Sequence, residues 1–143
     1  MTGIFFIINI AASLFLCGLI WIIQLVHYPF FRFANPGNFK EAMDFHRARI
    51  SWIVVPVMLA EIFTSGWLAF YADSWQSLHL TGFIIVLLIW LVSFFLQVPI
   101  HAKLSKNYNR NLIKKLVSTN LFRTLLWTAK AGLSVEILRR IFF

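Results

Sequence analysis

A long apolar run near the start of the chain constrains the fold more than any other feature. From Gly3 to Phe31 there is no Lys, Arg, Asp or Glu, and most side chains are aliphatic or aromatic. About 20 apolar residues in a helix are enough to cross the hydrocarbon core of a bilayer. The run is also longer than the apolar part of a signal peptide. It therefore predicts a retained transmembrane helix at about residues 4–31.

Three further apolar segments are long enough to cross a bilayer. We predict them at residues 51–71, 78–102 and 116–138, with an amphipathic cytoplasmic extension at 39–50. Asn38 is the expected N-cap of the second helix, and Pro56 predicts a kink within it. Because short connections make successive helices antiparallel neighbours, we expect residues 1–143 to form a single transmembrane domain. The predicted fold is all-α, an integral membrane four-helix up-down bundle.

The composition supports lipid as the surrounding medium. Hydrophobic residues make up 60% of the chain and charged residues 13%, against about 45–50% and 25% in soluble domains. A small domain leaves much of its surface exposed and cannot bury such an excess in water. These numbers exclude a soluble enzyme and a disordered tail. The single cysteine, Cys17, excludes a scaffold held by intrachain disulfides.

The distribution of positive charge predicts the orientation. The formal net charge is +8, and the basic residues cluster at the ends of the apolar runs. The side with the two long loops carries Arg32, Lys40, Arg47, Arg49, Lys103, Lys106, Arg110, Lys114 and Lys115, and the other side carries only Arg139 and Arg140. Lys and Arg mark cytoplasmic loops, so we expect an N-out/C-out protein of the bacterial inner membrane. The basic loops are expected to contact anionic lipid, and no nucleic acid partner is expected.

Polar side chains inside the predicted spans are the candidates for function, because the membrane makes them costly. They follow helical spacing on three helices. The sets are Gln24, His27 and Tyr28 on the first, Ser93, Gln97 and His101 on the third, and Asn120, Arg123, Trp127, Lys130 and Ser134 on the fourth. Residues three or four apart share a face of a helix. Each set is therefore expected to face the interior of the bundle.

The depth of these residues predicts which of them meet. With a rise of about 1.5 Å per residue, His27, His46 and His101 converge at the cytoplasmic mouth of the bundle. Glu61 comes out near mid-membrane, where Lys130 or Arg123 is its expected ion-pair partner. His79 lies at the opposite end.

Three kinds of chemistry remain open for this histidine cluster. Three imidazoles with one open position resemble a catalytic metal site, with His27, His46 and His101 as ligands. Two of them on opposed helices would instead suit haem as axial ligands. With no cofactor, a histidine could exchange a proton with a bound phenol or quinone, and Arg49 or Arg123 could stabilise the oxyanion. The sequence does not decide between haem, a divalent metal and neither.

A faint repeat relates the two halves of the chain. His27 and His46 are 19 positions apart, as are His101 and Asn120, and Arg49 and Arg123 extend the match. The spacing predicts a duplicated two-helix unit, with coincidence as the alternative. The chain has no Gly-rich phosphate loop, no CxxC pair and no GxSxG motif. Nucleotide hydrolysis and dinucleotide binding are therefore not expected.

The segment Val98-Pro99-Ile100-His101-x-x-Leu104, followed by Asn120-x-x-Arg123, resembles the pattern of the small anthrone-oxygenase-like membrane family. Members of that family are similar to this chain in size and in having four helices. The resemblance covers about a third of the chain and implies an oxygenase that acts on polycyclic phenols, with His101, Asn120 and Arg123 in its site. A looser similarity is to the membrane protoporphyrinogen oxidases of the HemJ type, which have an early-helix histidine and a haem partner.

Together these observations predict a membrane oxidoreductase or oxygenase-like protein. Its substrate is expected to be flat and hydrophobic (aromatic, quinone- or porphyrin-like), bound in a cytoplasm-facing cleft lined by histidines. The expected catalytic residues are His27, His46, His101, Arg49, Arg123 and Glu61, and the expected substrate contacts are Gln24, Tyr28, Gln97, Asn120, Trp127 and Lys130. Two alternatives remain. One is a non-catalytic subunit or scaffold that packs against a larger membrane partner or a second copy. The other is a carrier of haem, metal or a lipophilic ligand.

Overall fold

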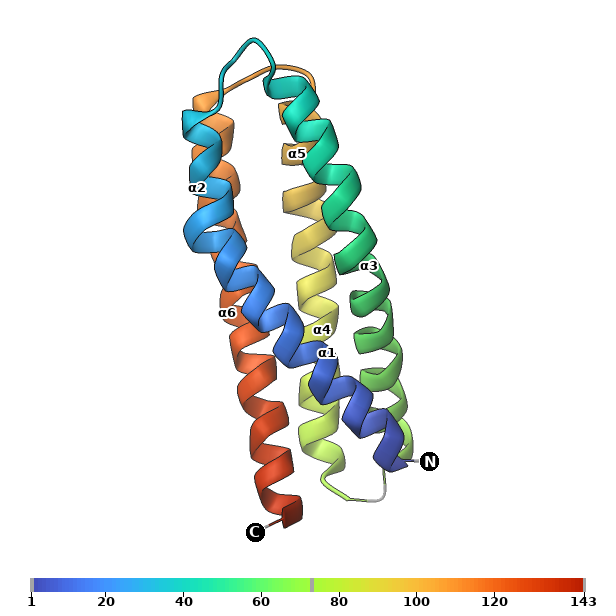
Figure 1. The fold of residues 1–143 in the computed structure, drawn as a ribbon. Helices are drawn as coiled ribbons and strands as arrows, with labels where there is room; N and C mark the ends of the chain where they lie inside the picture. The colour runs from blue at the N-terminus through green and yellow to red at the C-terminus, as the bar shows by residue number, and fades with distance from the viewer. Residues whose placement is uncertain (1, 73, 143) are drawn as a thin grey trace.

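The computed structural model describes residues 2–72 and 74–142, which form helices and no strand (Figure 1). The first half of the chain holds a segmented helix and a long continuous one. Its elements are α1 (Thr2–Ile22), η1 (Ile23–His27), α2 (Tyr28–Phe30), η2 (Phe31–Phe33) and α3 (Phe39–Tyr71). The second half has the same plan. Its elements are α4 (Gln76–Val92), η3 (Ser93–Gln97), α5 (Val98–Leu104) and α6 (Arg110–Phe142).

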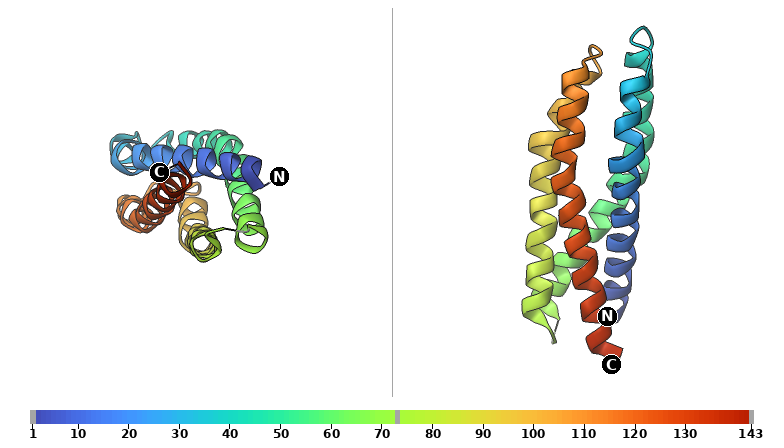
Figure 2. Two further views of the ribbon diagram at one scale, coloured as in Figure 1. Left: turned by 90° about the horizontal axis from the view of Figure 1, so that it is seen from below. Right: turned by 90° about the vertical axis from the view of Figure 1, so that its left-hand side faces the viewer.

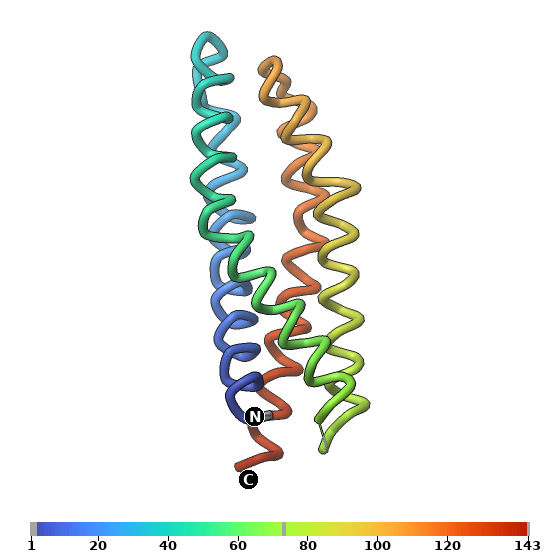
Figure 3. The backbone as a smooth tube through the Cα atoms, turned by 90° about the vertical axis from the view of Figure 1, so that its right-hand side faces the viewer, coloured from blue at the N-terminus to red at the C-terminus, as the bar shows by residue number. Residues whose placement is uncertain are grey.

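The helices lie side by side, and each segmented helix contacts both long ones. α1 packs against α3 and α6, and α4 packs against the same two helices. The view along the helices in Figure 2 shows this arrangement. The connections that follow η2 and α5 lie at one end, and both termini lie at the other (Figure 1). Figure 3 shows α3 bending along its length, so that it diverges from α4 and α5 toward the end with the long connections.

A proline explains why each segmented helix is interrupted. In η1 the N–H of Tyr28 donates to the carbonyl of Ile23, and in η3 the N–H of Val98 donates to Ser93. These five-residue steps are π-helical turns, and a proline, Pro29 or Pro99, follows two positions after the end of each. Proline has no N–H and its ring clashes with the carbonyl four residues earlier. A wider turn at that point removes the clash and keeps the helix going.

These interruptions correct the repeat seen in the sequence. The two π turns begin at Ile23 and Ser93, and the two prolines follow at the same spacing of 70 positions. The repeat predicted from the polar residues has a spacing of 74, which pairs His27 with His101. The duplicated plan is therefore carried by the backbone, and the matching histidines do not occupy equivalent positions within it.

Three helical segments are long and apolar enough to cross a membrane. They are Gly3–Phe33, Phe39–Tyr71 and Gln76–Leu104. Many of their large apolar side chains are exposed on the outside of the bundle, which supports a membrane location. α6 has the required length, but it carries more polar residues and is less apolar than the other three segments. The fourth span predicted at 116–138 stays a prediction.

The helix ends differ in detail from expectation. Asn38 occupies the N-cap position of α3 but its side chain makes no capping hydrogen bond. At α6 the side chain of Asn109 does so, because its Oδ1 accepts from the N–H groups of Asn111 and Leu112 at 2.9 and 3.0 Å. α3 continues through Pro56 without a break.

Candidate functional site

Three histidines and one tyrosine form a row near the end with the long connections, and we call it the histidine row. His27 Nε2 lies 2.8 Å from His46 Nδ1, and the Tyr28 hydroxyl lies 2.9 Å from His101 Nε2. The ring centroids of His46 and His101 are 5.7 Å apart. The π turns help to build the row, because His27 ends η1 and His101 follows η3 by one turn. The structure thus brings together the three histidines expected at one mouth of the bundle.

A pocket of about 350 Å³ opens between α3 and the η3–α5 segment, and we call it the ligand pocket. Its wall is mostly apolar. The lining residues are Ile23, Tyr28, Ile50, Ser51, Val54, Val55, Met58, Trp90, Ser93, Phe94, Gln97, Val98, His101 and Arg123. Phe94 and Val98 at its rim are exposed on the outside of the bundle. In a membrane, the pocket would therefore open sideways toward lipid.

Unpartnered polar atoms gather around this pocket. Within the described residues, five buried side-chain nitrogen or oxygen atoms have no hydrogen-bond partner. They are His46 Nε2, Trp90 Nε1, Gln97 Oε1, His101 Nδ1 and Arg123 Nε. All of these residues except His46 line the ligand pocket. A buried polar group without a partner is costly, so such a concentration at one pocket indicates a ligand that hydrogen-bonds there.

Arg123 is held in place at the inner wall of the ligand pocket. Its Nη1 donates to Asn120 Oδ1 at 3.2 Å, and its guanidinium lies 5.0 Å from the centre of the Trp127 ring. The Asn120 amide donates to Gln24 Oε1 at 2.9 Å, and Gln24 donates to the Val117 carbonyl. Gln24 and Asn120, expected to contact substrate, therefore position Arg123 and are not part of the pocket wall.

A second pocket, which we call the outer pocket, lies on the other side of α3. It measures about 430 Å³ and lies between the first segmented helix and α3. His27, His46 and Arg49 supply its polar groups. Arg49 is exposed and its guanidinium lies 5.3 Å from the Phe45 ring. The cluster expected in one cleft is therefore divided, since His101 and Arg123 line the ligand pocket and Arg49 does not.

A fully buried carboxylate lies deeper in the bundle. Glu61 Oε1 accepts from Ser13 Oγ at 2.8 Å, and Oε2 accepts from Trp127 Nε1 at 3.0 Å. Lys130 Nζ donates to Ser13 Oγ at 3.2 Å, so Ser13 bridges the two charged residues. The described residues contain no direct ion pair of Glu61 with Lys130 or Arg123. The predicted contact is indirect because the Ser13 hydroxyl lies between the charges.

Further hydrogen bonds extend this polar network, which includes residues that the sequence analysis did not select. Lys130 Nζ also donates to Asn9 Oδ1 at 2.8 Å and to Ser134 Oγ at 3.0 Å. The Asn9 amide donates to Thr64 Oγ1 and Ser65 Oγ at 2.9 and 2.8 Å. The network thus ties α1, α3 and α6 together. Trp127 and Lys130, expected to contact substrate, belong to it and do not line the ligand pocket, because they lie one and two turns beyond Arg123.

The arrangement of the imidazoles does not form the predicted metal site. Within residues 2–72 and 74–142, no three His, Cys, Asp or Glu side chains are grouped so that they could hold a metal ion. The facing nitrogens of His27 and His46 lie at hydrogen-bond distance, which leaves no room for an ion between them. His101 likewise directs one nitrogen at Tyr28.

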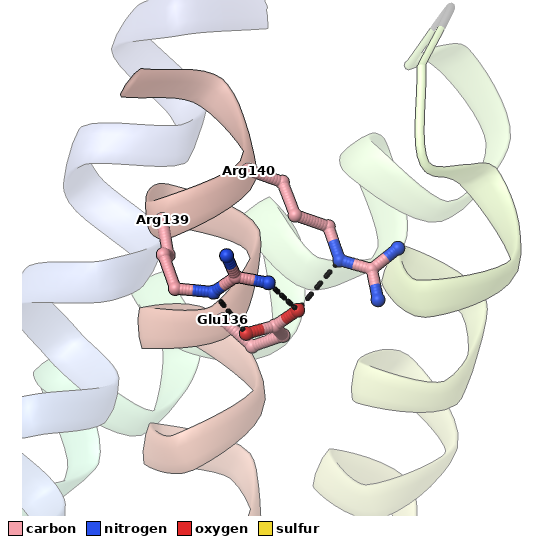
Figure 4. Close-up of polar contacts among 3 residues, drawn as sticks. All are labelled: Glu136, Arg139 and Arg140. Carbon is pink, nitrogen blue, oxygen red and sulfur yellow. Dashed lines mark hydrogen bonds and ion pairs between the residues drawn. The ribbon is translucent and has the colours of Figure 1, made fainter. Parts of the chain in front are cut away.

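The end of the bundle that holds the termini has a different set of contacts. His79 lines a separate pocket there and packs edge-on against Phe6. Figure 4 shows Arg139 and Arg140 turned toward the carboxylate of Glu136, with nitrogen–oxygen distances of 2.6 to 2.9 Å. His79 is therefore far from the histidine row, and both arginines at this end are paired within α6.

Comparisons of the chain with protein-family models, with curated proteins and with solved structures found no match in any of the three. The function must therefore be argued from the site itself.

Proposed function

We propose that this chain is an integral membrane oxidoreductase or oxygenase-like protein whose substrate is a flat hydrophobic phenol or quinone bound in the ligand pocket. One observation carries the proposal. The largely apolar pocket is lined by four residues with buried, unpartnered polar atoms, two of which, Gln97 and Arg123, are themselves buried. Apolar walls with a few convergent polar groups are what small-molecule sites have in common.

The polar groups suit a ligand that carries an acidic hydroxyl or a carbonyl. His101 supplies a base whose second nitrogen is oriented by Tyr28. Arg123 supplies a fixed positive charge for the oxyanion that forms when the hydroxyl loses its proton. Gln97 is fixed by its amide donating to Thr119 Oγ1 at 2.9 Å, which leaves its carbonyl oxygen to accept from the ligand. This chemistry agrees with the resemblance to the anthrone-oxygenase-like family.

The proposed orientation of the protein in the membrane rests on the charges at the two ends of the bundle. We place the long connections in the cytoplasm because they carry most of the basic residues. Arg139 and Arg140 share the carboxylate of Glu136, which lowers the net positive charge at the other end further. The ligand pocket and the histidine row then lie in the cytoplasmic half of the bilayer. The substitution Lys106→Cys, made in a protein that also carries Cys17→Ser, should react with an impermeant maleimide only in inside-out vesicles.

The binding site is tested with 1,8-dihydroxyanthraquinone, which is both a phenol and a quinone. The protein in lipid nanodiscs is titrated with it, and binding is followed by its visible absorption. Replacing His101 by Phe or Gln97 by Leu removes one hydrogen bond each. Such a loss should weaken binding about tenfold. Val55→Trp fills the pocket from its rim and should abolish binding.

His79→Phe is the matched control, because it also removes a histidine that lines a pocket but lies at the other end of the bundle. It should leave the affinity unchanged. Equal binding by the wild type and the Val55→Trp variant would refute the site. Oxygen uptake with anthrone as substrate tests turnover, and its absence in a protein that binds the probe would favour the carrier.

A further inference from the structure

No hydrogen bond joins His46 to His101 in the histidine row, and each of these two rings keeps one buried nitrogen without a partner. His46 uses Nδ1 toward His27 and His101 uses Nε2 toward Tyr28. The remaining nitrogens, His46 Nε2 and His101 Nδ1, are buried without a partner. The two rings are 5.7 Å apart and inclined by 32°. Two hydrogen bonds of about 2.8 Å in series span a distance of the same order as this ring separation.

The two ends of the row lie in different pockets. His101 and Tyr28 line the ligand pocket, whereas His27 lines the outer pocket on the other side of α3. His46 lies between them and is only 8% exposed. His27 is partly exposed. The row therefore connects two partly exposed imidazoles, one in each pocket, through a buried one.

We propose that the histidine row is a proton relay that connects the ligand pocket to the outer pocket, closed between His46 and His101 by one bridging hydroxyl group. The proton leaves His101 Nδ1 for the bridging oxygen, which gives a proton to His46 Nε2. His46 then releases its other proton from Nδ1 to His27 Nε2. Only N–H and O–H bonds form and break, and no electrons are transferred. Imidazole suits such a step because it accepts at one nitrogen and donates from the other.

The bridging group has two sources, a water molecule or the hydroxyl of the ligand itself. Both present an oxygen that donates and accepts, so either completes the row whichever tautomers the rings adopt. The role of the relay rests on the proposed function, since the relay would carry away the proton that the ligand loses. Its existence can nevertheless be tested without any ligand.

The test is hydrogen–deuterium exchange at the ring nitrogens of His101, measured by NMR on protein with ¹⁵N-labelled histidine in nanodiscs. With four histidines in the chain, the ring signals can be assigned by single substitution. His46→Phe keeps an aromatic ring but removes both nitrogens. It should slow exchange at His101 about tenfold or more, as expected when a hydrogen-bonded path is lost. His27→Ala should also slow exchange at His101, and imidazole added to that variant should restore it. His79→Phe should have no effect.

Unchanged exchange at His101 in His46→Phe would overturn the relay, because His101 would then exchange directly through the ligand pocket. If His46→Phe does not fold, His27→Phe gives the same readout at a less buried position. Repeating the measurement with 1,8-dihydroxyanthraquinone bound separates the two bridging groups. The His101 signals should shift in either case, because His101 lines the ligand pocket. A bridging water predicts that the His46 signals stay the same, and a bridging ligand hydroxyl predicts that they shift as well. Failure of the probe to bind would refute the proposed function alone.

Discussion

Replacing Lys130 with methionine should destabilise the bundle by about 1–3 kcal/mol. Lys130 Nζ donates three hydrogen bonds, to Asn9, Ser13 and Ser134, at 2.8 to 3.2 Å. Two of these bonds, to Asn9 and Ser13, join α6 to α1, whereas Ser134 lies on α6 itself. Hydrogen bonds between membrane helices are worth about 0.6 kcal/mol on average and at most about 1.7, so the two give this range. Methionine has a similar length, so the change removes the hydrogen bonds and the charge without leaving a large cavity.

The free energy of unfolding is measured by titration with sodium dodecyl sulfate in mixed micelles, followed by far-ultraviolet circular dichroism. Lys114→Met is the matched control, since Lys114 lies on the same helix but is exposed. It should change the free energy by no more than about 0.5 kcal/mol. The same assay on Glu61→Gln and on the double variant measures how strongly the two buried charged residues depend on each other.

The two substitutions should not be additive, because Ser13 bonds both Glu61 and Lys130. The double variant should lose about 1–3 kcal/mol less than the sum of the single losses, since removing one charge leaves the other uncompensated. Strict additivity would refute the coupling through Ser13. Equal stability of Lys130→Met and the Lys114→Met control would refute the network as a whole.

Three further predictions follow from local packing. Gly132→Ala should raise stability by about 0.5–1 kcal/mol, because a Cβ there meets nothing within 4 Å. Gly82→Ala should raise stability less than Gly132→Ala does, because a Cβ there would lie 3.4 Å from the side chains of Lys130 and Leu133. Trp127→Phe removes the hydrogen bond to Glu61 and should cost about 1 kcal/mol in the same detergent titration. Pro99→Ala removes the reason for the π turn, so the ring ¹⁵N signals of His101 should shift when the helix relaxes to regular α geometry.

The apolar runs and the helical spacing of polar residues account for much of what could be predicted from the sequence. The apolar runs predicted the positions of the three helical segments Gly3–Phe33, Phe39–Tyr71 and Gln76–Leu104 closely, because about 20 apolar residues are needed to cross a bilayer. α6 extends beyond the predicted span 116–138 at both ends. The helical spacing of polar residues also selected Tyr28, His101 and Arg123, which line one pocket. The expectation that His27, His46 and His101 lie near one end rested on depth alone, and depth is a one-dimensional quantity that the helix rise supplies.

The polar network was only half visible in the sequence. Glu61 and Lys130 stand out as charges, but Asn9 and Ser13 are small and lie within an apolar run. Their spacing does indicate burial, because these two residues are four positions apart and continue the buried stripe of Leu16, Ile20 and Ile23. Reading that stripe would have placed both side chains inside the bundle.

The division of the histidine row between two pockets could not be predicted. It depends on where α3 lies between its neighbours and on its divergence from α4 and α5 (Figure 3). These are tertiary properties that residue spacing does not encode. The π turns were missed for a related reason. A proline in a helical pattern predicts that the helix is distorted nearby, but a kink and a widened turn both remove the clash with the proline ring.

Each π turn is equivalent to one residue inserted into a regular helix, and that has a consequence for how this site can arise and be lost. If the turn Ser93–Gln97 relaxed to α geometry with all of its residues kept, everything beyond it would rotate by about 100° relative to the part before. His101 would then leave the side of the helix that faces Tyr28, while the outer, lipid-exposed face would change little in character. The same holds for η1 and His27. The histidine row therefore depends on both π turns keeping their wider geometry.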